Sequence, residues 1–149
     1  FRLVPQLFSE LTEMLRGIVN RIREQERLIL EISERTAIVM PELVQVFMQE
    51  MQSRGVAFAL DDFGSGLSTF DYLKQLEVDY VKLDGSLVRD VASSRVSQAM
   101  VHAVNYVVHV MGMESIAEFV ESDAIVAAVR KLSVDYLQGY AIGRPEPIA

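Results

Sequence analysis

Cysteine is absent from this sequence of 149 residues. Its absence excludes disulfides and thiolate metal sites, and it fits a reducing compartment. Long hydrophobic runs are absent too, because no apolar stretch approaches the roughly 20 residues that a membrane span needs, and no signal-peptide pattern opens the chain. We therefore expect a soluble, cytoplasmic chain without a membrane segment.

Basic residues are scarce. The sequence has 14 Lys and Arg against 21 Asp and Glu, which gives a net charge of −7 and a pI near 4.8. Binding along a DNA or RNA polymer requires a basic surface, so this composition argues against it. A small anionic ligand is still compatible, because bound cations invert the local charge of a carboxylate cluster.

The length and the 50% hydrophobic content predict one packed domain over residues 1–149. Helical spacing of apolar residues predicts helices over 9–25, from 36 or 41 to 54, and over 68–76, 94–111 and 123–132. Short apolar runs between them predict strands over 28–32, 56–60, 79–84, 114–118 and 134–138. This alternation implies right-handed crossovers and an α/β fold with a parallel sheet covered by helices.

Polar side chains mark the carboxyl end of each predicted strand. They are Glu31, Asp61 with Asp62, Lys82, Glu118 and Gln138. In parallel α/β folds these strand ends converge on one face, where the active sites of TIM barrels form. Paired aspartates before a glycine-containing loop suit divalent metal ions, so the convergence predicts a metal site.

Simpler explanations exist for some of these residues. In the first, Asp61 or Asp62 does no more than cap a helix that starts near Ser68. In the second, Lys82 lies in an edge strand and its side chain faces solvent. A buried lysine instead needs a charged partner. His102 and His109 lie seven residues apart in one predicted helix, but no acidic residue lies at close helical spacing, so we do not interpret them as a metal pair.

Four ordered motifs resemble the EAL-domain family of cyclic di-GMP phosphodiesterases. They are LDDFGSG at 60–66, YVKLD at 80–84, AEFVE at 117–121 and QGY at 138–140. The resemblance extends from about residue 28 to residue 147 and implies a TIM-like (β/α) barrel with one strand reversed. Phe119 stands where many members have glycine, and Leu67 stands where an aromatic residue is common.

Two metal ligands of the family have no counterpart in this sequence. They are the Glu of the Glu-Ala-Leu motif and an Asn on the following strand, and the first 27 residues match the family poorly. We therefore expect a partial barrel, with only the C-terminal five βα units, exposed edges at 28–32 and 134–138, and an incomplete N-terminal part. The 149 residues alone should associate through those edges or fail to fold cooperatively, and should hydrolyse no cyclic di-GMP.

The resemblance implies two divalent ions, Mg²⁺ or Mn²⁺, which prefer oxygen ligands. It assigns Glu31 to one ion, Asp61 to a bridge between the ions, Asp62 to the second ion, and Glu118 to a further ligand position. Such a site cleaves a phosphodiester, and here the product would be linear pGpG.

The remaining roles also follow from the resemblance. Lys82 would orient and help deprotonate the attacking water, so that Lys82, Glu118 and Asp62 are the candidate catalytic residues. Glu121 and Gln138 would support the water and the ligand network. Glu34 would anchor the loop 63–70 and couple it to metal binding and dimerisation.

The family resemblance also implies partners. They are cyclic di-GMP itself, a second copy in a homodimer, and a sensory or GGDEF-type domain fused to or regulating the chain. The alternative function is a catalytically inactive cyclic di-GMP receptor or dimerisation module, which the two missing ligands favour.

Overall fold

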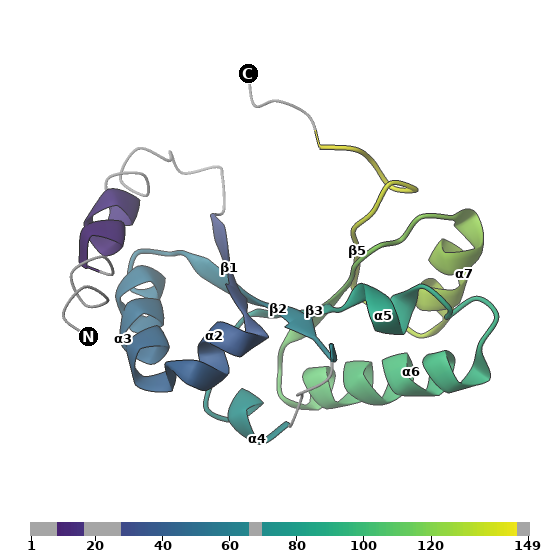
Figure 1. Cartoon of the computed structure of the whole chain (residues 1–149), viewed down its shortest axis with the longest axis horizontal. Helices are drawn as coiled ribbons and strands as arrows, with labels where there is room; N and C mark the ends of the chain where they lie inside the picture. The colour runs from purple at the N-terminus through teal and green to yellow at the C-terminus, as the bar shows by residue number, and fades with distance from the viewer. Residues whose placement is uncertain (1–8, 17–27, 66–69, 146–149) are drawn as a thin grey trace.

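Five parallel strands form one sheet in the computed structural model, which describes residues 9–16, 28–65 and 70–145. The strands are β1 (Ile29–Ser33), β2 (Ala57–Phe63), β3 (Tyr80–Leu83), β4 (Glu114–Ala117) and β5 (Tyr136–Leu137). They lie side by side in chain order (Figure 1). The predicted parallel sheet of five strands is confirmed, and each strand lies within one to three residues of its predicted bounds.

Six helices connect or flank these strands in the described part of the chain. They are α2 (Glu34–Val39), α3 (Pro41–Gln52), α4 (Phe70–Leu73), α5 (Gly85–Val88), α6 (Arg95–Val110) and α7 (Asp123–Lys131). Residues 9–16 are helical as well, and the rest of the helix predicted over 9–25 lies outside the described residues. None of the described helices combines the length and apolar character that crossing a bilayer requires.

Three helix predictions need correction. The helix expected from 36 or 41 to 54 is two helices, because Met40 adopts φ −133° and ψ 56° before Pro41, and a residue before proline avoids the helical region. The helix expected over 68–76 is the short α4, and residues 66–69 lie outside the described part. Helix α5 was not predicted; the Asp84 carboxylate caps it by accepting a hydrogen bond from the Ser86 N–H at 2.9 Å.

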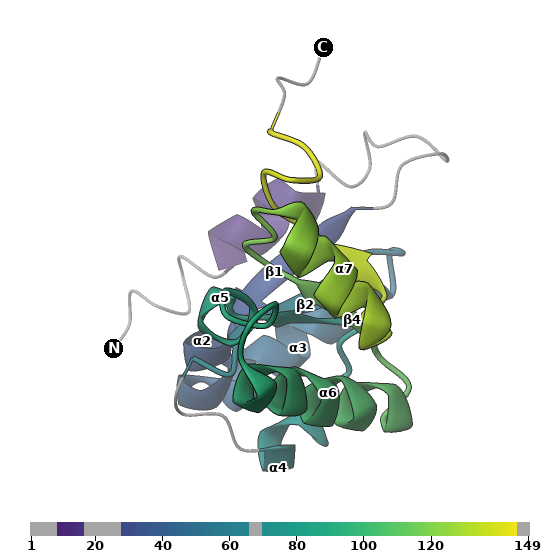
Figure 2. The same ribbon diagram turned by 90° about the vertical axis from the view of Figure 1, so that its right-hand side faces the viewer.

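Side-chain alternation divides the sheet into two faces. Phe58 and Leu60 of β2, together with Val81 and Leu83 of β3, are fully buried in the main core beneath the helices. The opposite face holds a smaller cluster around Ala57, Ala59 and Tyr80. Figure 1 and Figure 2 show the helices outside the curved sheet, as in a section of barrel wall. Strands β1 and β5 form its two edges, as predicted, while association through these edges remains a prediction.

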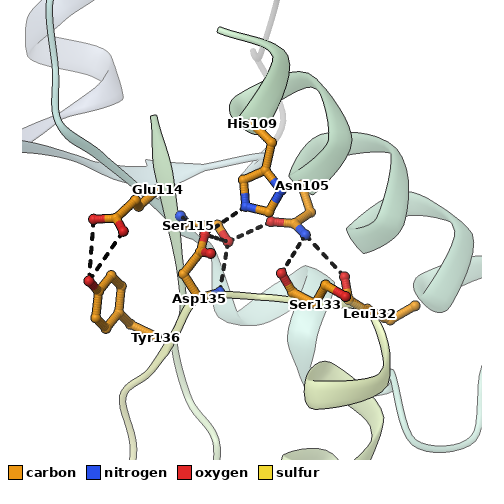
Figure 3. Close-up of polar contacts among 8 residues, drawn as sticks. All are labelled: Asn105, His109, Glu114, Ser115, Leu132, Ser133, Asp135 and Tyr136. Carbon is orange, nitrogen blue, oxygen red and sulfur yellow. Dashed lines mark hydrogen bonds and ion pairs between the residues drawn. The ribbon is translucent and has the colours of Figure 1, made fainter. Parts of the chain in front are cut away.

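A polar network fixes the entry to β5 (Figure 3). The Asp135 carboxylate accepts hydrogen bonds from the Ser115 N–H at 2.8 Å and pairs with His109 Nε2 at 2.7 Å. Burial alone would raise the pKa of Asp135, but the hydrogen bonds from Ser115 and His109 outweigh it and lower the pKa. Asn105, also in α6, donates to the carbonyl oxygens of Leu132 and Ser133. The network therefore ties α6 to the starts of β4 and β5.

The same network gives His109 a structural partner. The acidic group comes from the segment before β5, 26 residues along the chain, so helical spacing alone did not reveal it. Asp79 plays a similar part before β3, where its carboxylate accepts a hydrogen bond from the Phe58 N–H at 2.9 Å. Both aspartates stand in a Val-Asp-Tyr sequence, and both anchor a strand to its neighbour.

Candidate active site

Lys82 lies at the centre of the site, buried to 3% exposure in the middle strand β3. Its Nζ atom lies 2.8 Å from Glu118 Oε1, 2.9 Å from Asp61 Oδ1 and 2.9 Å from Glu31 Oε1. These partners come from β1, from β2 and from the residue that follows β4, so the predicted convergence of Glu31, Asp61, Lys82 and Glu118 is present. The alternative in which Lys82 faces solvent from an edge strand is wrong.

The surrounding carboxylates keep Lys82 charged. Burial alone would lower the pKa of this lysine, but hydrogen bonds with Glu118, Asp61 and Glu31 outweigh that effect and raise the pKa above its usual range. A buried ammonium held by several carboxylates is stable only while those partners remain ionised. The interior of the site therefore holds a fixed positive charge.

Asp61 and Asp62 reach the same side of the sheet, although adjacent residues in a regular strand point to opposite faces. The register between β2 and β3 shifts between Leu60 and Phe63, where three residue steps in β2 match two in β3. Asp62 also adopts φ 61°. The extra residue forms a bulge that redirects a side chain. Both aspartates belong to β2, so the reading in which they only cap a helix is wrong.

Oxygen atoms of Asp61, Asp62 and Glu118 lie within 4.8 Å of one another. Burial, followed by the charges of Asp61 and Asp84, raises the pKa of Asp62. Burial also raises the pKa of Glu118, although Lys82 opposes the shift. Carboxylate oxygens at this spacing fit a hard divalent cation, which would relieve the repulsion between them. Glu31 is connected to this cluster by Lys82, whose Nζ atom pairs with Glu31 as well as with Asp61 and Glu118.

A pocket of about 230 Å³ adjoins this cluster. Its lining residues are Glu118, Phe119, Glu121, Gln138, Gly139 and Tyr140. The predicted residues Glu121 and Gln138 therefore share a pocket with Glu118, and both are exposed. The Val120 N–H donates to the Gln138 carbonyl oxygen at 3.1 Å, so the chain after β4 is bound to the chain after β5.

Phe119, which stands where many family members have glycine, occupies a backbone conformation that suits glycine. It adopts φ 53°, a left-handed conformation that glycine adopts readily and a bulky residue rarely does. The ring lies against Gly85, and the Arg89 guanidinium lies 5.0 Å from the ring centroid. Gly85 and Arg89 were not predicted as part of the site, because no motif in the sequence pairs them with Phe119. Leu67, the other departure, lies outside the described residues.

We expect Gly85→Ala to destabilise the protein by about 1 to 3 kcal/mol, because a Cβ atom there would lie 2.4 Å from Phe119 Cδ2. In a Phe119→Gly background the same change should cost nothing, since alanine favours the helical conformation by up to about 1 kcal/mol. Urea unfolding of the four variants in this cycle measures the coupling. Equal costs in both backgrounds would show that the ring does not restrict position 85.

Glu34 is the first residue of α2 and is buried to 3% exposure. The Tyr72 hydroxyl donates a hydrogen bond to Glu34 Oε1. Burial and this carboxylate together raise the pKa of Tyr72 above its usual range. Glu34 therefore contacts α4, which follows the loop that it was predicted to anchor. The contact with Tyr72 was not predicted.

The family model for the EAL domain matches residues 4–145. The chain therefore belongs to the EAL-domain family, as the sequence motifs predicted. It is 40% identical over 141 residues to the cyclic di-GMP phosphodiesterase PdeB of Shewanella oneidensis, an alignment that covers 89% of this chain and 16% of that protein. The chain thus spans about a sixth of the length of this curated relative.

Solved EAL domains share the fold. The chain is similar to the FimX EAL domain of Pseudomonas aeruginosa bound to c-di-GMP, with a TM-score of 0.81, 29% identity, and coverage of 95% of this chain and 57% of that chain. It is also similar to a manganese and cy-diGMP complex of Klebsiella pneumoniae BlrP1, with a TM-score of 0.73, 28% identity, and coverage of 78% and 30%. These domains are TIM-like barrels, and the five-stranded sheet corresponds to part of one.

Proposed function

We propose that the chain provides part of a metal-dependent active site that hydrolyses a phosphodiester bond of cyclic di-GMP and releases linear pGpG. The observation that carries the proposal is the arrangement of Asp61, Asp62 and Glu118 within 4.8 Å of one another beside the buried Lys82. The proposed substrate is supported by relatives named for cyclic di-GMP hydrolysis and by solved relatives that contain this nucleotide.

Glu31, Asp61 and Asp62 would hold two divalent ions, Mg²⁺ or Mn²⁺, with Glu118 as a further ligand. Such a pair of ions, when bound, supplies an activated nucleophile and stabilises charge on the attacking and leaving oxygens. The raised pKa values of Asp62 and Glu118 support this role, because two crowded carboxylates gain most from a neighbouring cation.

Lys82 would position the attacking water and influence its proton. Its ammonium group is held by carboxylates from β1, from β2 and from the residue after β4, so the position of Nζ is fixed before a substrate arrives. Such preorganisation lowers the cost of stabilising charge in the transition state. Lys82, Asp62 and Glu118 are therefore the proposed catalytic residues.

Glu121 and Gln138 would contact the water and ligand network from the adjoining pocket. Glu34 would hold the loop 63–70 through the hydrogen bond that it accepts from Tyr72 of α4. We further propose a homodimer and regulation by a sensory or GGDEF-type domain. A cytoplasmic location remains a prediction from the sequence.

A cyclic di-GMP receptor is the second candidate function. The carboxylates around Lys82 and the adjoining pocket lined by Glu118, Glu121 and Gln138 would also suit binding of the nucleotide without its hydrolysis. The two functions differ in one observable, which is turnover of bound nucleotide.

Calorimetry and chromatography together separate these functions. We expect cyclic di-GMP to bind in the presence of Mn²⁺, and we expect pGpG to form once the chain is joined to the N-terminal part of a relative's EAL domain. Lys82→Ala in that chimera should abolish turnover while keeping affinity within a few fold, because its interaction matters most in the transition state. Binding without turnover would favour the receptor, and no binding to either polypeptide would contradict both functions.

A further inference from the structure

Two aspartates bind the entries of β3 and β5 to the strand beside each. Asp79, the residue before β3, accepts a hydrogen bond from the Phe58 N–H of β2 at 2.9 Å, and its own N–H donates to the Phe58 carbonyl oxygen at 2.9 Å. Asp135, the residue before β5, accepts from the Ser115 N–H of β4 at 2.8 Å, and its own N–H donates to Ser115 Oγ at 3.2 Å (Figure 3). We name the pairs Phe58–Asp79 and Ser115–Asp135 the strand pins.

Each member of a strand pin stands three residues before a residue of the candidate active site, toward the carboxyl end of the same strand. These site residues are Asp61 after Phe58, Lys82 after Asp79, Glu118 after Ser115 and Gln138 after Asp135. The Asp61 Oδ1 and Lys82 Nζ atoms lie 2.9 Å apart, and Glu118 and Gln138 line one pocket. Each pin therefore joins the same two strands as the pair of site residues above it.

The two pinned strands are too short to fix their own register firmly. Strand β3 has four residues and β5 has two. Because side chains alternate with a period of two, burial of one face opposes a slip by one residue but not a slip by two. A slip by two residues would move a side chain by about 6.6 Å along its neighbour, which would separate Lys82 from Asp61. A carboxylate bound to one particular N–H at the strand entry allows a single register.

We propose that Asp79 and Asp135 are positioning residues, which set the height of Lys82 and Gln138 along the sheet relative to Asp61 and Glu118. The observation that carries the proposal is repetition. The same Val-Asp-Tyr sequence, the same reciprocal hydrogen bonds and the same spacing of three residues occur at two separate places in one sheet. Groups of a metal or catalytic site must be held within about 0.5 Å of their working positions, so an error at the strand entry would be felt at the site.

Calorimetric titration of the whole chain with Mn²⁺ tests the role of Asp79, and this readout rests on the metal site of the proposed function. Asp79→Ala should weaken Mn²⁺ binding on the order of 10-fold. Asp79→Asn should keep the affinity of the chain, because its amide oxygen accepts the same hydrogen bond from the Phe58 N–H. Asp79→Glu keeps the charge but places the carboxylate one carbon farther out, so it should bind as weakly as Asp79→Ala. Weak binding by Asp79→Asn with unchanged binding by Asp79→Glu would overturn the proposal, because charge and not register would then matter.

A control variant separates positioning from a general loss of stability. Val101 is fully buried in α6, so Val101→Ala leaves a cavity and lowers the free energy of unfolding. It should bind Mn²⁺ as tightly as the unchanged chain, because neither strand pin is altered. If Asp79→Ala behaved like Val101→Ala, with lower stability and unchanged affinity, the aspartate would only stabilise the sheet. That result would overturn the proposal and leave the metal site intact.

The second pin and a metal-free measurement complete the test. Asp135→Ala should also weaken Mn²⁺ binding, and Asp135→Asn should restore it, which keeps the proposal open to contradiction if Asp79→Ala does not fold. If the unchanged chain bound no Mn²⁺, the proposed function would fail, and a double-mutant cycle in urea would test the pins alone. The double variant of Asp79→Glu and Lys82→Met should lose less stability than the sum of the single variants, because an unpinned Lys82 has already lost part of its ion pairing. Additive losses would overturn the proposal.

Discussion

Lys82→Met is expected to lower the free energy of unfolding by about 3 kcal/mol at neutral pH. The substitution keeps the buried length of the side chain but removes the ammonium group that lies within 2.9 Å of oxygens on Glu31, Asp61 and Glu118. The carboxylates would then repel one another without compensation. The loss stays near the lower end of the range for buried ion pairs because Glu31 is half exposed. Urea unfolding monitored by circular dichroism measures it.

The pH dependence of this variant follows from the carboxylates. The pKa values of Asp62 and Glu118 are already raised in the folded state, so their ionised forms oppose folding, and protonation removes the penalty. The deficit of Lys82→Met should therefore shrink as the pH falls toward the pKa values of these groups. Mn²⁺ should also reduce it at neutral pH. Lys74→Met is the control, because the pair that Lys74 forms with Asp71 is exposed. Equal losses of stability in both variants would contradict the role of Lys82.

Gly139→Ala should destabilise the protein by at least about 3 kcal/mol. A Cβ atom at this position would lie 2.4 Å from both the backbone nitrogen and the carbonyl oxygen of Val120. Those atoms take part in the hydrogen bonds that join Val120 to Gln138 and Ala141, so neither can move without breaking the connection between β4 and β5. The expected result is a lower midpoint in urea and a distorted pocket beside Glu118.

Gly143→Ala is the matched control for this prediction. No atom lies within 4 Å of the position that a Cβ atom would take there, so its stability should change by less than about 0.5 kcal/mol. If Gly139→Ala were as stable as Gly143→Ala, the close approach of the chains after β4 and β5 would not exist in solution.

Much of the site could be predicted from the sequence because its main features are local. Short apolar runs that end in acidic residues specify both a strand and its polar carboxyl end, and parallel pairing then brings those ends together. Lys82 could be predicted for the same reason, since a lysine within an apolar strand requires anionic partners. The convergence of Glu31, Asp61, Lys82 and Glu118 follows from these two rules alone.

Other features depend on backbone geometry that no sequence pattern specifies. The bulge that places Asp61 and Asp62 on one side arises from the register of β2 against β3. The contact of Phe119 with Gly85 and Arg89 joins segments about 30 residues apart. It also requires a left-handed backbone conformation, which a phenylalanine in the sequence does not predict. Helix α5 is only one turn long, so it lacks the periodicity by which longer helices are predicted.

Calorimetric titration with Mn²⁺ tests the central claim most directly, because the claim is that the carboxylates around Lys82 form a cation site. We predict saturable binding to the chain, loss of that binding in Asp61→Ala, and retention in Asp71→Ala, whose exposed carboxylate lies outside the cluster. Equal binding by the chain and by Asp61→Ala would contradict the claim, because the ion would then be held somewhere other than at the ends of these strands.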